Sequence, residues 1–284
     1  MSARTVVVTG ASTGIGRACA LRLDKTGWRV FAGVRKDEDA QSLARDASGR
    51  LTPLILDVAD AAHVADAARR VREAAGDEGL GGLVNNAGIT VQGPLEYLSI
   101  DELRRQFEVN VIAQLAVTQA FLPLLRRATG RIVFMSSISG RAEALPIIGP
   151  YAASKRALEA LAESLRVELL PWRIRVVLIE PGSIATPIWE KGVATFDDLV
   201  ATLSDEAKER YLKTLERARV VGQKSGERGI PPERVADKVE HALTSPRPRF
   251  RYVVGIDAHA QARLMPALPR ALRDKAIGRL LGYD

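Results

Sequence analysis

The stretch Thr5-Val-Val-Val-Thr-Gly-Ala-Ser-Thr-Gly-Ile-Gly16 decides the fold of this chain. It opens with a run of β-branched residues, which is typical of a buried strand, and it leads directly into an apolar helical pattern. A glycine-rich turn between a strand and a helix lets a phosphate group approach the backbone, and the amino end of the helix favours negative charge. The stretch therefore predicts a dinucleotide site, although its spacing, Gly-x-x-x-Gly-x-Gly, differs from the general Gly-x-Gly-x-x-Gly pattern.

Strand and helix patterns alternate along the rest of the chain. Short apolar runs predict strands at Thr5–Thr9, Arg29–Val34, Leu51–Leu56, Gly82–Asn85, Arg131–Ser136, Arg175–Glu180 and Arg251–Gly255. Helical patterns lie between them at Gly14–Lys25, Asp39–Ala47, Ala61–Ala75, Ser99–Arg127 and Tyr151–Leu169. Strands that are buried on both faces and separated by helices are typical of parallel sheets. The predicted fold class is α/β: a doubly wound parallel sheet (Rossmann fold) in three α/β/α layers.

The pattern changes after Pro181. Residues 189–219 are irregular and then helical and charge-rich, and Pro231-Pro232 opens another helix that reaches Thr244. We predict one domain over residues 1–284, with its core at 1–188 and 230–256, a helical insert at 189–229 and a basic C-terminal extension at 257–284. The insert follows the carboxyl ends of the strands, where ligands bind in open α/β sheets, so we expect it on the substrate side.

The composition is that of an ordinary soluble globular protein, with 46% hydrophobic and 26% charged residues among 284. The amino terminus runs straight into the first strand without the pattern of a signal peptide. The single cysteine, Cys19, excludes an intramolecular disulfide and lies in an apolar helix, which favours a core position. We therefore expect a cytoplasmic protein.

Most of the formal net charge of +7 lies near the C-terminus. From Ser245 onward, eight Arg and Lys residues stand against three Asp residues, and the rest of the chain is nearly neutral. A basic surface spread over a fold is typical of nucleic-acid binding, whereas a basic tail on a neutral body indicates a local contact. We expect no nucleic-acid partner. The tail either packs on the domain with a solvated basic face or makes a weak peripheral contact with anionic lipid.

A tyrosine and a lysine, Tyr151 and Lys155, stand four residues apart in a helical pattern and so share one helix face. A nearby positive charge favours the phenolate, so Lys155 is expected to lower the pKa of Tyr151 from about 10 toward neutrality. A tyrosine tuned in this way can exchange a proton with an alcohol or carbonyl oxygen. The pair alone is weak, because this spacing occurs by chance on many helices.

The end of the second strand bears on the choice between NAD and NADP. At this position an acidic residue binds the 2′-hydroxyl of NAD, and an arginine accommodates the 2′-phosphate of NADP. Val34 stands at the acidic position, and the guanidinium of Arg35 beside it suits a phosphate by charge and shape. Asp37, Glu38 and Asp39 weaken this signal unless they only begin the following helix. We predict NADP(H), with NAD(H) as the alternative.

As a set, these motifs resemble the short-chain dehydrogenase/reductase family over residues 5 to about 190. They stand in the family's order and at ordinary spacings. The set comprises Thr9-Gly-x-x-x-Gly-x-Gly16, Asp57-Val58, Asn85-Asn-Ala-Gly88, Asn110 in Glu108-Val-Asn-Val, Ser137 in Ser136-Ser-Ile-Ser-Gly140, Tyr151-x-x-x-Lys155 and Pro181-Gly-Ser-Ile-Ala-Thr186.

The resemblance implies a role for each matching residue. It makes Tyr151 the acid/base, Lys155 the residue that binds the nicotinamide ribose, and Ser137 a hydrogen-bond partner of the substrate oxygen. Asn110 would position a water that relays protons. Asp57 and Val58 would hold the adenine, and Ile184 and Thr186 would contact the carboxamide. The implied cofactor-binding set is Gly10, Ser12, Thr13, Gly14, Ile15, Gly16, Arg35, Asp57, Val58, Asn86, Ala87, Gly88, Tyr151, Lys155, Pro181, Gly182, Ile184 and Thr186.

The C-terminal third resembles, more loosely, the branch of this family that contains hydroxysteroid and retinol dehydrogenases. Pro232-Glu-Arg-Val-Ala, His241-Ala-Leu-Thr and Arg249-Phe-Arg-Tyr-Val-Val-Gly255 carry this likeness. It implies an NADP(H)-dependent oxidoreductase that interconverts a secondary alcohol and a ketone, or a primary alcohol and an aldehyde. The substrate would be lipophilic, such as a steroid, retinoid or fatty carbonyl. The resemblance also implies a homodimer or homotetramer paired through the long helices.

The alternative function is a catalytically silent, NADP-binding sensor that kept the fold and lost the chemistry. Such proteins tend to lose the tyrosine or the lysine, and this chain keeps both with Ser137 and Asn110. No metal site is predicted, because His63, His241 and His259 are scattered and lack ligand spacing.

Overall fold

Seven strands form one sheet in the computed structural model, which describes residues 4–142 and 144–283, without the side chains of 190–195 and 266. The strands are β1 (Thr5–Val8), β2 (Arg29–Val34), β3 (Leu51–Ile55), β4 (Gly82–Asn85), β5 (Arg131–Met135), β6 (Arg175–Pro181) and β7 (Arg251–Val254). They run parallel in the order β3-β2-β1-β4-β5-β6-β7. The order reverses between β1 and β4, the kind of point where open α/β sheets bind ligands. Each predicted strand is confirmed to within one residue.

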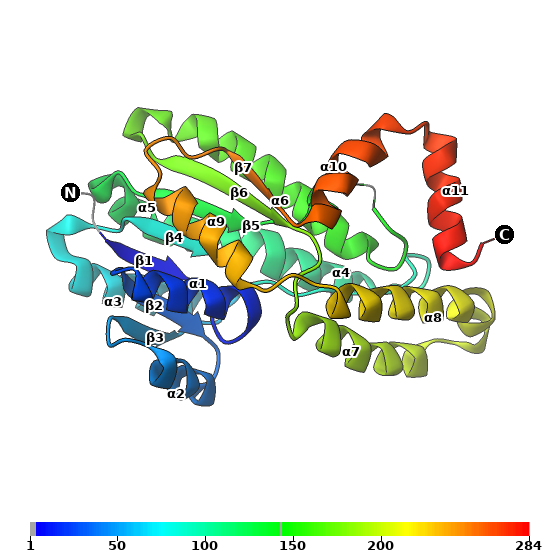
Figure 1. The fold of residues 1–284 in the computed structure, drawn as a ribbon. Coiled ribbons are helices and arrows are strands. Elements are labelled where there is room, and N and C mark those ends of the chain that lie inside the picture. Colours follow the sequence, from blue (N-terminus) through cyan, green and yellow to red (C-terminus); the bar gives the residue numbers. More distant parts are fainter. Residues whose placement is uncertain (1–3, 143, 284) are drawn as a thin grey trace.

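Helices cover both faces of this sheet (Figure 1). One face carries α1 (Gly14–Lys25), α2 (Asp37–Asp46) and α9 (Glu233–Thr244), and the other carries α3 (Ala61–Ala75), α5 (Ala113–Ala128) and α6 (Gly149–Glu168). Val6 and Val8 of β1 point into the first of two cores, and Val7 points into the second. This arrangement is what a strand buried on both faces requires, and it confirms the predicted three-layer, doubly wound fold.

The predicted helix Ser99–Arg127 is interrupted by one wider turn. The helix α4 (Ile100–Phe107) passes through a π turn (Glu108–Ile112) into α5. Such turns often mark functional sites, and this one carries Asn110. Among the described residues, Ile100–Ala128 is the one helix long and apolar enough to cross a membrane. Half of its apolar stretch is buried, and α5 packs against α3 and β4, as the core helix of a globular domain does.

Two helices form the insert between β6 and α9, namely α7 (Ile188–Thr202) and α8 (Asp205–Glu227). The sequence predicted an irregular start here, but the helix begins at Ile188. The two helices pack against each other around Phe196, Leu203 and Leu215. Tertiary packing of this kind supplies most of the stability of helices in proteins. Because α7 begins shortly after the end of β6, the pair lies beside the carboxyl ends of the strands (Figure 1).

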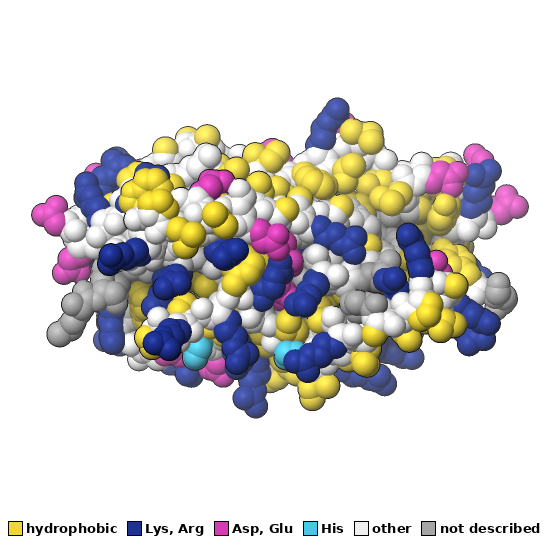
Figure 2. Space-filling view, turned by 90° about the horizontal axis from the view of Figure 1, so that it is seen from above, with side chains coloured by type: hydrophobic (Ala, Val, Ile, Leu, Met, Phe, Trp, Pro, Cys, Tyr) yellow, Lys and Arg dark blue, Asp and Glu magenta, His cyan; other side chains and the backbone are white. Residues whose placement is uncertain are grey.

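The C-terminal extension consists of α10 (Ile256–Ala267) and α11 (Arg270–Leu281), which stand out from the sheet and its flanking helices (Figure 1). Ala258 and Ala262 of α10 pack on Ile138 and Ala142, and α11 contacts α8. Figure 2 shows Lys and Arg side chains scattered among hydrophobic ones over the face that includes this extension. The large exposed apolar residues of the C-terminal extension are Ile256, Leu264, Leu268, Leu272, Leu280 and Tyr283.

Three short 3₁₀ turns complete the described elements, at Gly76–Glu78, Ile138–Gly140 and Leu170–Trp172. Cys19 is fully buried in α1, and burial raises the pKa of its thiol to about 12. A thiol with so high a pKa is almost entirely protonated at neutral pH and therefore unreactive. The predicted core position of Cys19 is confirmed.

Candidate active site

The glycine turn after β1 is shaped for a close approach to the backbone. Gly10 and Gly14 have φ angles of 64° and 57°, in the left-handed region that favours glycine. A Cβ on Gly16 would overlap the carbonyl oxygen of Gly10. Thr13 precedes α1 without a side-chain bond to that helix, and the first turn of α1 carries no acidic residue. The amide groups at this helix end are therefore available for an anion, and the turn fits the pyrophosphate of a dinucleotide.

A second segment, the loop after β4, is tied to the glycine turn across the point where the strand order reverses. The hydroxyl oxygen of Thr9 accepts hydrogen bonds from the backbone N–H groups of Asn86 and Ala87, each at 3.0 Å. The side-chain amide of Asn86 donates in return to the carbonyl oxygens of Thr9 and Gly10. The structure thus brings the predicted segment Asn86-Ala87-Gly88 against the glycine turn. Three other predicted cofactor residues, Ser12, Thr13 and Ile15, belong to the same turn.

The loop after β6 lies on another side of the glycine turn. A Cβ on Gly14 would lie 3.1 Å from the side chain of Thr186, so these two predicted cofactor residues are neighbours. Ile184 is buried, and its carbonyl oxygen accepts a hydrogen bond of 2.7 Å from Nε1 of Trp189 at the start of α7. The loop that begins with Pro181 and Gly182 is therefore fixed both to the glycine turn and to the insert.

The charged residues after β2 divide into two groups. Arg35 and Lys36 are exposed beyond the end of the strand. Asp37, Glu38 and Asp39 form the first turn of α2, where the helix dipole favours carboxylates. The three acidic residues therefore begin the next helix, and Arg35 is the first charged residue at the end of the strand.

The loop after β3 holds the two residues predicted to contact the adenine. Val58 is buried, and Asp57 accepts a hydrogen bond from the backbone of Ala59. Nδ1 of His63 accepts a hydrogen bond of 3.3 Å from the backbone nitrogen of Asp57. His63 thus supports this loop, and the described residues contain no group of three His, Cys, Asp or Glu side chains that could hold a metal ion.

Ser137 and Tyr151 come from different elements and meet. Ser137 follows β5 and precedes the turn Ile138–Gly140, while Tyr151 lies in the first turn of α6. Burial raises the pKa of the Tyr151 phenol, and a hydrogen bond with Ser137 opposes that rise. The two side chains converge, as the sequence predicted, so that one substrate oxygen could contact both.

Lys155 lies one turn farther along α6, with a buried side chain. Its Nζ donates to the carbonyl oxygen of Met135 at 2.8 Å and lies 5.6 Å from the centre of the Tyr151 ring. Burial lowers the pKa of Lys155 to about 8, and the carboxylate of Glu159 opposes that change. The prediction that Lys155 lowers the pKa of Tyr151 is wrong here, because the ammonium group lies over the ring and bonds a carbonyl while burial dominates at the phenol.

Asn110 is buried in the π turn and holds the loop after β4. Its Oδ1 accepts from the backbone nitrogen of Ile89 at 2.9 Å, and its Nδ2 donates to the carbonyl oxygen of Ile89 at 3.0 Å and to Ser154 at 3.2 Å. Gly88 packs between this amide and Lys155, since a Cβ there would lie 3.2 Å from Oδ1 and 3.8 Å from Nζ. Both N–H directions of Asn110 are thus used within the protein, and its water-relay role stays a prediction.

Comparison with known proteins assigns the family. Residues 4–195 match the family model described as short chain dehydrogenase. The chain is a short-chain dehydrogenase. It is 35% identical over 277 residues to an NADPH-dependent 3-dehydrocapnine reductase from Ornithobacterium rhinotracheale, covering 96% of this chain and 95% of that protein. It is 36% identical over 285 residues to retinol dehydrogenase 7 from Rattus norvegicus, covering 96% and 87%.

A solved structure agrees with this family assignment. A short chain dehydrogenase from Burkholderia cenocepacia J2315, in complex with NADP, superimposes with a TM-score of 0.72 at 28% identity, covering 95% of this chain and 96% of that one. The resemblance to the hydroxysteroid and retinol dehydrogenase branch is confirmed by the curated relatives.

This short-chain dehydrogenase also carries a buried ionic cluster whose members are not among the predicted site residues. It joins Glu159 of α6, Glu180 of β6 and Arg251 of β7. The four-residue spacing from Lys155 could have found Glu159, because it places both on one helix face. Glu180 is the one acidic residue in the apolar strand β6, which is a second signal. Nothing in the local sequence identifies Arg251 as their partner.

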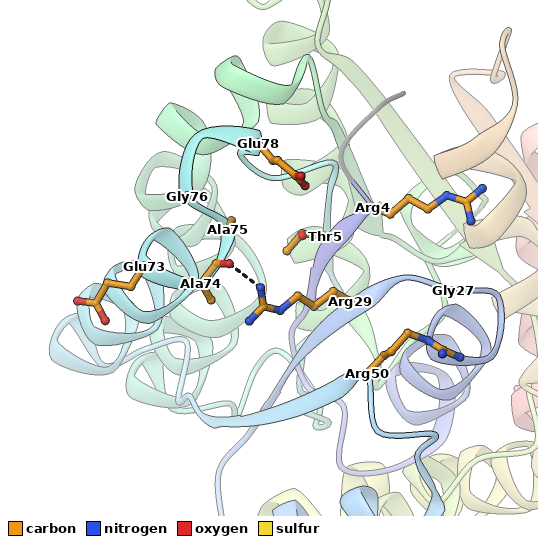
Figure 3. Close-up of a pocket in the computed structure, with 10 residues that line it drawn as sticks. All are labelled: Arg4, Thr5, Gly27, Arg29, Arg50, Glu73, Ala74, Ala75, Gly76 and Glu78. Carbon is orange, nitrogen blue, oxygen red and sulfur yellow. Dashed lines mark hydrogen bonds between the residues drawn. The ribbon is translucent and has the colours of Figure 1, made fainter.

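A hollow of about 410 Å³ lies at the opposite, amino-terminal edge of the strands (Figure 3). Arg4, Arg29 and Arg50 border it from the starts of β1, β2 and β3. Figure 3 shows Arg29 reaching the carbonyl oxygen of Ala74, while Arg4 and Arg50 point another way. The three guanidinium groups do not converge, so the hollow is not built as an anion site, and none of the predicted site residues lines it.

Proposed function

We propose that this short-chain dehydrogenase is an NADP(H)-dependent oxidoreductase that interconverts an alcohol and a carbonyl group on a lipophilic substrate. The observation that carries the proposal is that the phenol of Tyr151 lies near Ser137, with the buried ammonium of Lys155 5.6 Å from the centre of the tyrosine ring. Gly88 connects Ser137, Tyr151 and Lys155 to the glycine turn. It packs against Lys155, and it follows Ala87, which contacts Gly10. Proton exchange and dinucleotide binding can therefore take place at one location.

Each side chain has a distinct task in carbonyl reduction. The bound nicotinamide supplies the hydride. Ser137 and Tyr151 hold the substrate oxygen between them, which orients the reacting carbon. Because burial keeps the pKa of Tyr151 high, the phenol is protonated at neutral pH and can donate its proton to the carbonyl oxygen. In alcohol oxidation the phenolate oxygen of Tyr151 takes the proton from the hydroxyl group of the alcohol, which restores the phenol.

Lys155 and Asn110 act beside this pair. With a pKa of about 8, Lys155 is largely protonated at neutral pH, and its ammonium group would hold the nicotinamide ribose. Asn110 fixes the loop at Ile89 and would position the water that returns a proton to Tyr151. Both residues are buried beside Gly88, which is exposed and has no side chain, so a cofactor that rested on Gly88 would lie close to them.

The preference for NADP(H) rests on Arg35. This residue is exposed at the end of β2, and the acidic residues after it belong to the first turn of α2. A guanidinium at this place suits the 2′-phosphate. The relative from Ornithobacterium rhinotracheale is named as NADPH-dependent, and the structure from Burkholderia cenocepacia contains NADP, which supports the same cofactor for this chain.

A lipophilic substrate is supported by exposed apolar residues near Gly149 and after the loop of Thr186. The side chain of Leu95 is 68% exposed, and its Cδ1 would lie 3.5 Å from a Cβ on Gly149, two residues before Tyr151. Ile188, which follows the loop of Thr186, is also exposed. Exposed apolar side chains beside polar reacting groups favour a substrate such as a steroid, retinoid or fatty carbonyl.

Turnover of steroid, retinoid and fatty carbonyls with NADPH and with NADH tests the proposal. Tyr151→Phe is expected to lower kcat by about 10²- to 10⁴-fold, because it removes the proton donor while the ring still fills the site. Tyr283→Phe, a change at an exposed residue near the C-terminus, is the control and should leave turnover intact. Full turnover by Tyr151→Phe would refute the mechanism. NADPH binding without oxidation over the whole panel would favour the sensor instead.

We further propose a homodimer or homotetramer located in the cytoplasm. Exposed apolar side chains on or beside the helical stretch from α4 to α5 and the helix α6 support self-association. They are those of Ile112, Val167, Leu170 and Trp172. Sedimentation of the native protein and of Leu170→Glu tests this proposal, and a monomer for the native protein at micromolar concentration would refute it. Imaging of a tagged chain in cells tests the location.

We also propose that the C-terminal extension makes a weak contact with anionic lipid. Its exposed leucines can enter the headgroup region while its arginine and lysine residues, such as Arg263 and Lys275, lie against the charged surface. Flotation with anionic vesicles at low salt tests this contact. Absence of binding there would refute it, whereas loss of binding with rising salt is expected of an electrostatic contribution.

A further inference from the structure

A buried ionic cluster lies next to the residues that are proposed to perform the chemistry. Nη1 of Arg251 donates to Oε2 of Glu159 at 2.5 Å and also donates to Oε1 of Glu180. Nη2 of the same guanidinium donates to Glu163 at 2.5 Å. The side chains of Glu159 and Glu180 are 7% and 0% exposed, whereas that of Glu163 is 55% exposed. Two buried carboxylates thus share one guanidinium.

Glu159 also contacts the corner of the chain that carries Ser137. Its Oε1 accepts a hydrogen bond of 2.6 Å from the hydroxyl of Ser136. Gly140 closes the same turn, and a Cβ there would lie 2.5 Å from that oxygen, so the absence of a side chain admits the carboxylate. One carboxylate therefore bonds the beginning of the turn Ser136–Gly140, in which Ser137 lies, and packs against its end.

The same carboxylate faces Lys155. Glu159 lies one helical turn after Lys155 on α6, and Lys155 bonds the carbonyl oxygen of Met135, the residue before Ser136. The titratable groups of α6 that face Lys155 are Tyr151 and Glu159. From the other elements, β5 offers the Met135 carbonyl, and the π turn offers the neutral amide of Asn110 near Gly88. Glu159 is thus the negative charge that acts on Lys155.

Charges from three other elements act on Glu159 in turn. Arg251 of β7 bonds it directly, and Glu180 of β6 shares that guanidinium. Arg141, which follows the turn Ile138–Gly140, lies 3.7 Å from Oε2 of Glu180, an atom that accepts no hydrogen bond from the described residues. Burial raises the pKa of Glu180, with its bond to Arg251 opposing. Arg251 therefore holds Glu159 in place and compensates much of its charge.

We propose that Glu159, held by Arg251, is a positioning residue that orients the turn of Ser137 and keeps Lys155 in its ammonium form. The roles of Ser137 and Lys155 in this proposal rest on the proposed function, but the effect on Lys155 is measurable without a substrate. Burial alone favours the neutral amine of Lys155, and the carboxylate of Glu159 opposes it. Removal of that charge lowers the pKa of Lys155 further.

Glu159→Gln is the decisive variant, because it keeps an acceptor oxygen for Ser136 and removes the charge. The titration of Lys155 is followed by NMR in protein with ¹³C-labelled lysine, with the signal assigned from Lys155→Arg. A midpoint near 8 is expected for the native protein, with a fall of about one pH unit or more in Glu159→Gln. Glu163→Gln is the matched control, since it removes a charge from the same helix and a partner from the same Arg251 without facing Lys155.

The outcomes separate this proposal from the proposed function. A Lys155 midpoint in Glu159→Gln that equals the midpoint in Glu163→Gln overturns the positioning role. Where Glu159→Gln fails to fold, Glu159→Asp keeps the charge, so its Lys155 midpoint should stay near the native value, and a fall overturns the role. With a carbonyl substrate, Glu159→Gln should also shift the alkaline limb of reduction to lower pH. A native protein that reduces no carbonyl overturns only the proposed function.

Discussion

The hydroxyl oxygen of Thr9 lies 3.0 Å from the backbone nitrogen of Asn86 and 3.0 Å from that of Ala87. These bonds join the ends of β1 and β4 at the point where the strand order reverses. The side chain of Thr9 is buried, and it bonds the loop after β4 just beyond the last paired residues of the two strands, Val8 and Val84. The shape of the glycine turn therefore depends on Thr9 as well as on the glycines.

Thr9→Val should destabilise the protein and weaken NADPH binding. The change keeps the shape of the side chain but leaves two partly buried N–H groups without this acceptor, at a cost of about 1–3 kcal/mol. Denaturant unfolding measures the loss of stability, and a fluorescence titration with NADPH should give about tenfold weaker binding. Thr9→Ser keeps the oxygen and serves as the control. Equal losses in both variants would show that the hydroxyl oxygen is not the cause.

Arg35→Ala should weaken the binding of NADPH and leave that of NADH nearly unchanged. Hydrogen bonds to charged groups contribute about 1.5–3 kcal/mol, so NADPH affinity should fall by about tenfold to a hundredfold. Titration of both cofactors measures the difference. Arg45→Ala, at an exposed position in the last turn of α2, is the control for a general loss of positive charge. Parallel losses for NADPH and NADH would contradict the assignment of Arg35 to the 2′-phosphate.

Carbonyl reduction should lose efficiency above about pH 8. Burial lowers the pKa of Lys155 from 10.5 to about 8, so the ammonium form is present below that pH and is lost above it. The phenol of Tyr151 has a raised pKa and stays protonated over the same range, so it does not cause this limb. The value of kcat/KM for NADPH, which reports the free enzyme, should be flat from pH 6 and then fall. A flat profile to pH 10 would contradict the proposed need for the ammonium form.

The helices, strands and turns that carry the site could be predicted, because interactions between residues close in the sequence determine them. Gly10 and Gly14 adopt the left-handed φ that only glycine takes easily, so the turn is visible in the sequence. Asp60 caps α3 by accepting bonds from two backbone N–H groups, and α3 has the predicted bounds, Ala61–Ala75. Ser137 and Tyr151 converge because one follows the end of β5 and the other lies in the first turn of α6, the next α-helix, and both elements were predicted from the regular alternation of strands and helices.

The electrostatics of the site could not be predicted, because they depend on contacts between distant segments. Glu159 and Arg251 are separated by 92 positions, and no local pattern pairs them. The pKa of Tyr151 was expected to fall because Lys155 is near in the sequence, but the burial of the phenol comes from the whole fold. The helix α7 likewise depends on its packing against α8.

Two glycines of α8, Gly222 and Gly226, should respond to alanine in opposite directions. A Cβ on Gly222 would lie 3.9 Å from the ring of Trp189, an ordinary contact, so Gly222→Ala should stabilise the helix by about 0.5–1 kcal/mol. A Cβ on Gly226 would lie 2.9 Å from Cγ of the same rigid ring, so Gly226→Ala should cost about 1 kcal/mol or more.

The displacement of Trp189 in Gly226→Ala should also disturb the loop after β6, which holds predicted cofactor residues. Nε1 of Trp189 donates to the carbonyl oxygen of Ile184, so a shifted ring loses that bond and loosens the segment between Ile184 and Thr186. Thermal unfolding of the two variants tests the sign of each effect on stability. NADPH titration should show weaker binding for Gly226→Ala alone. Shifts of the same sign in both variants would mean that Trp189 moves freely, and that the insert is not coupled to the dinucleotide site through this ring.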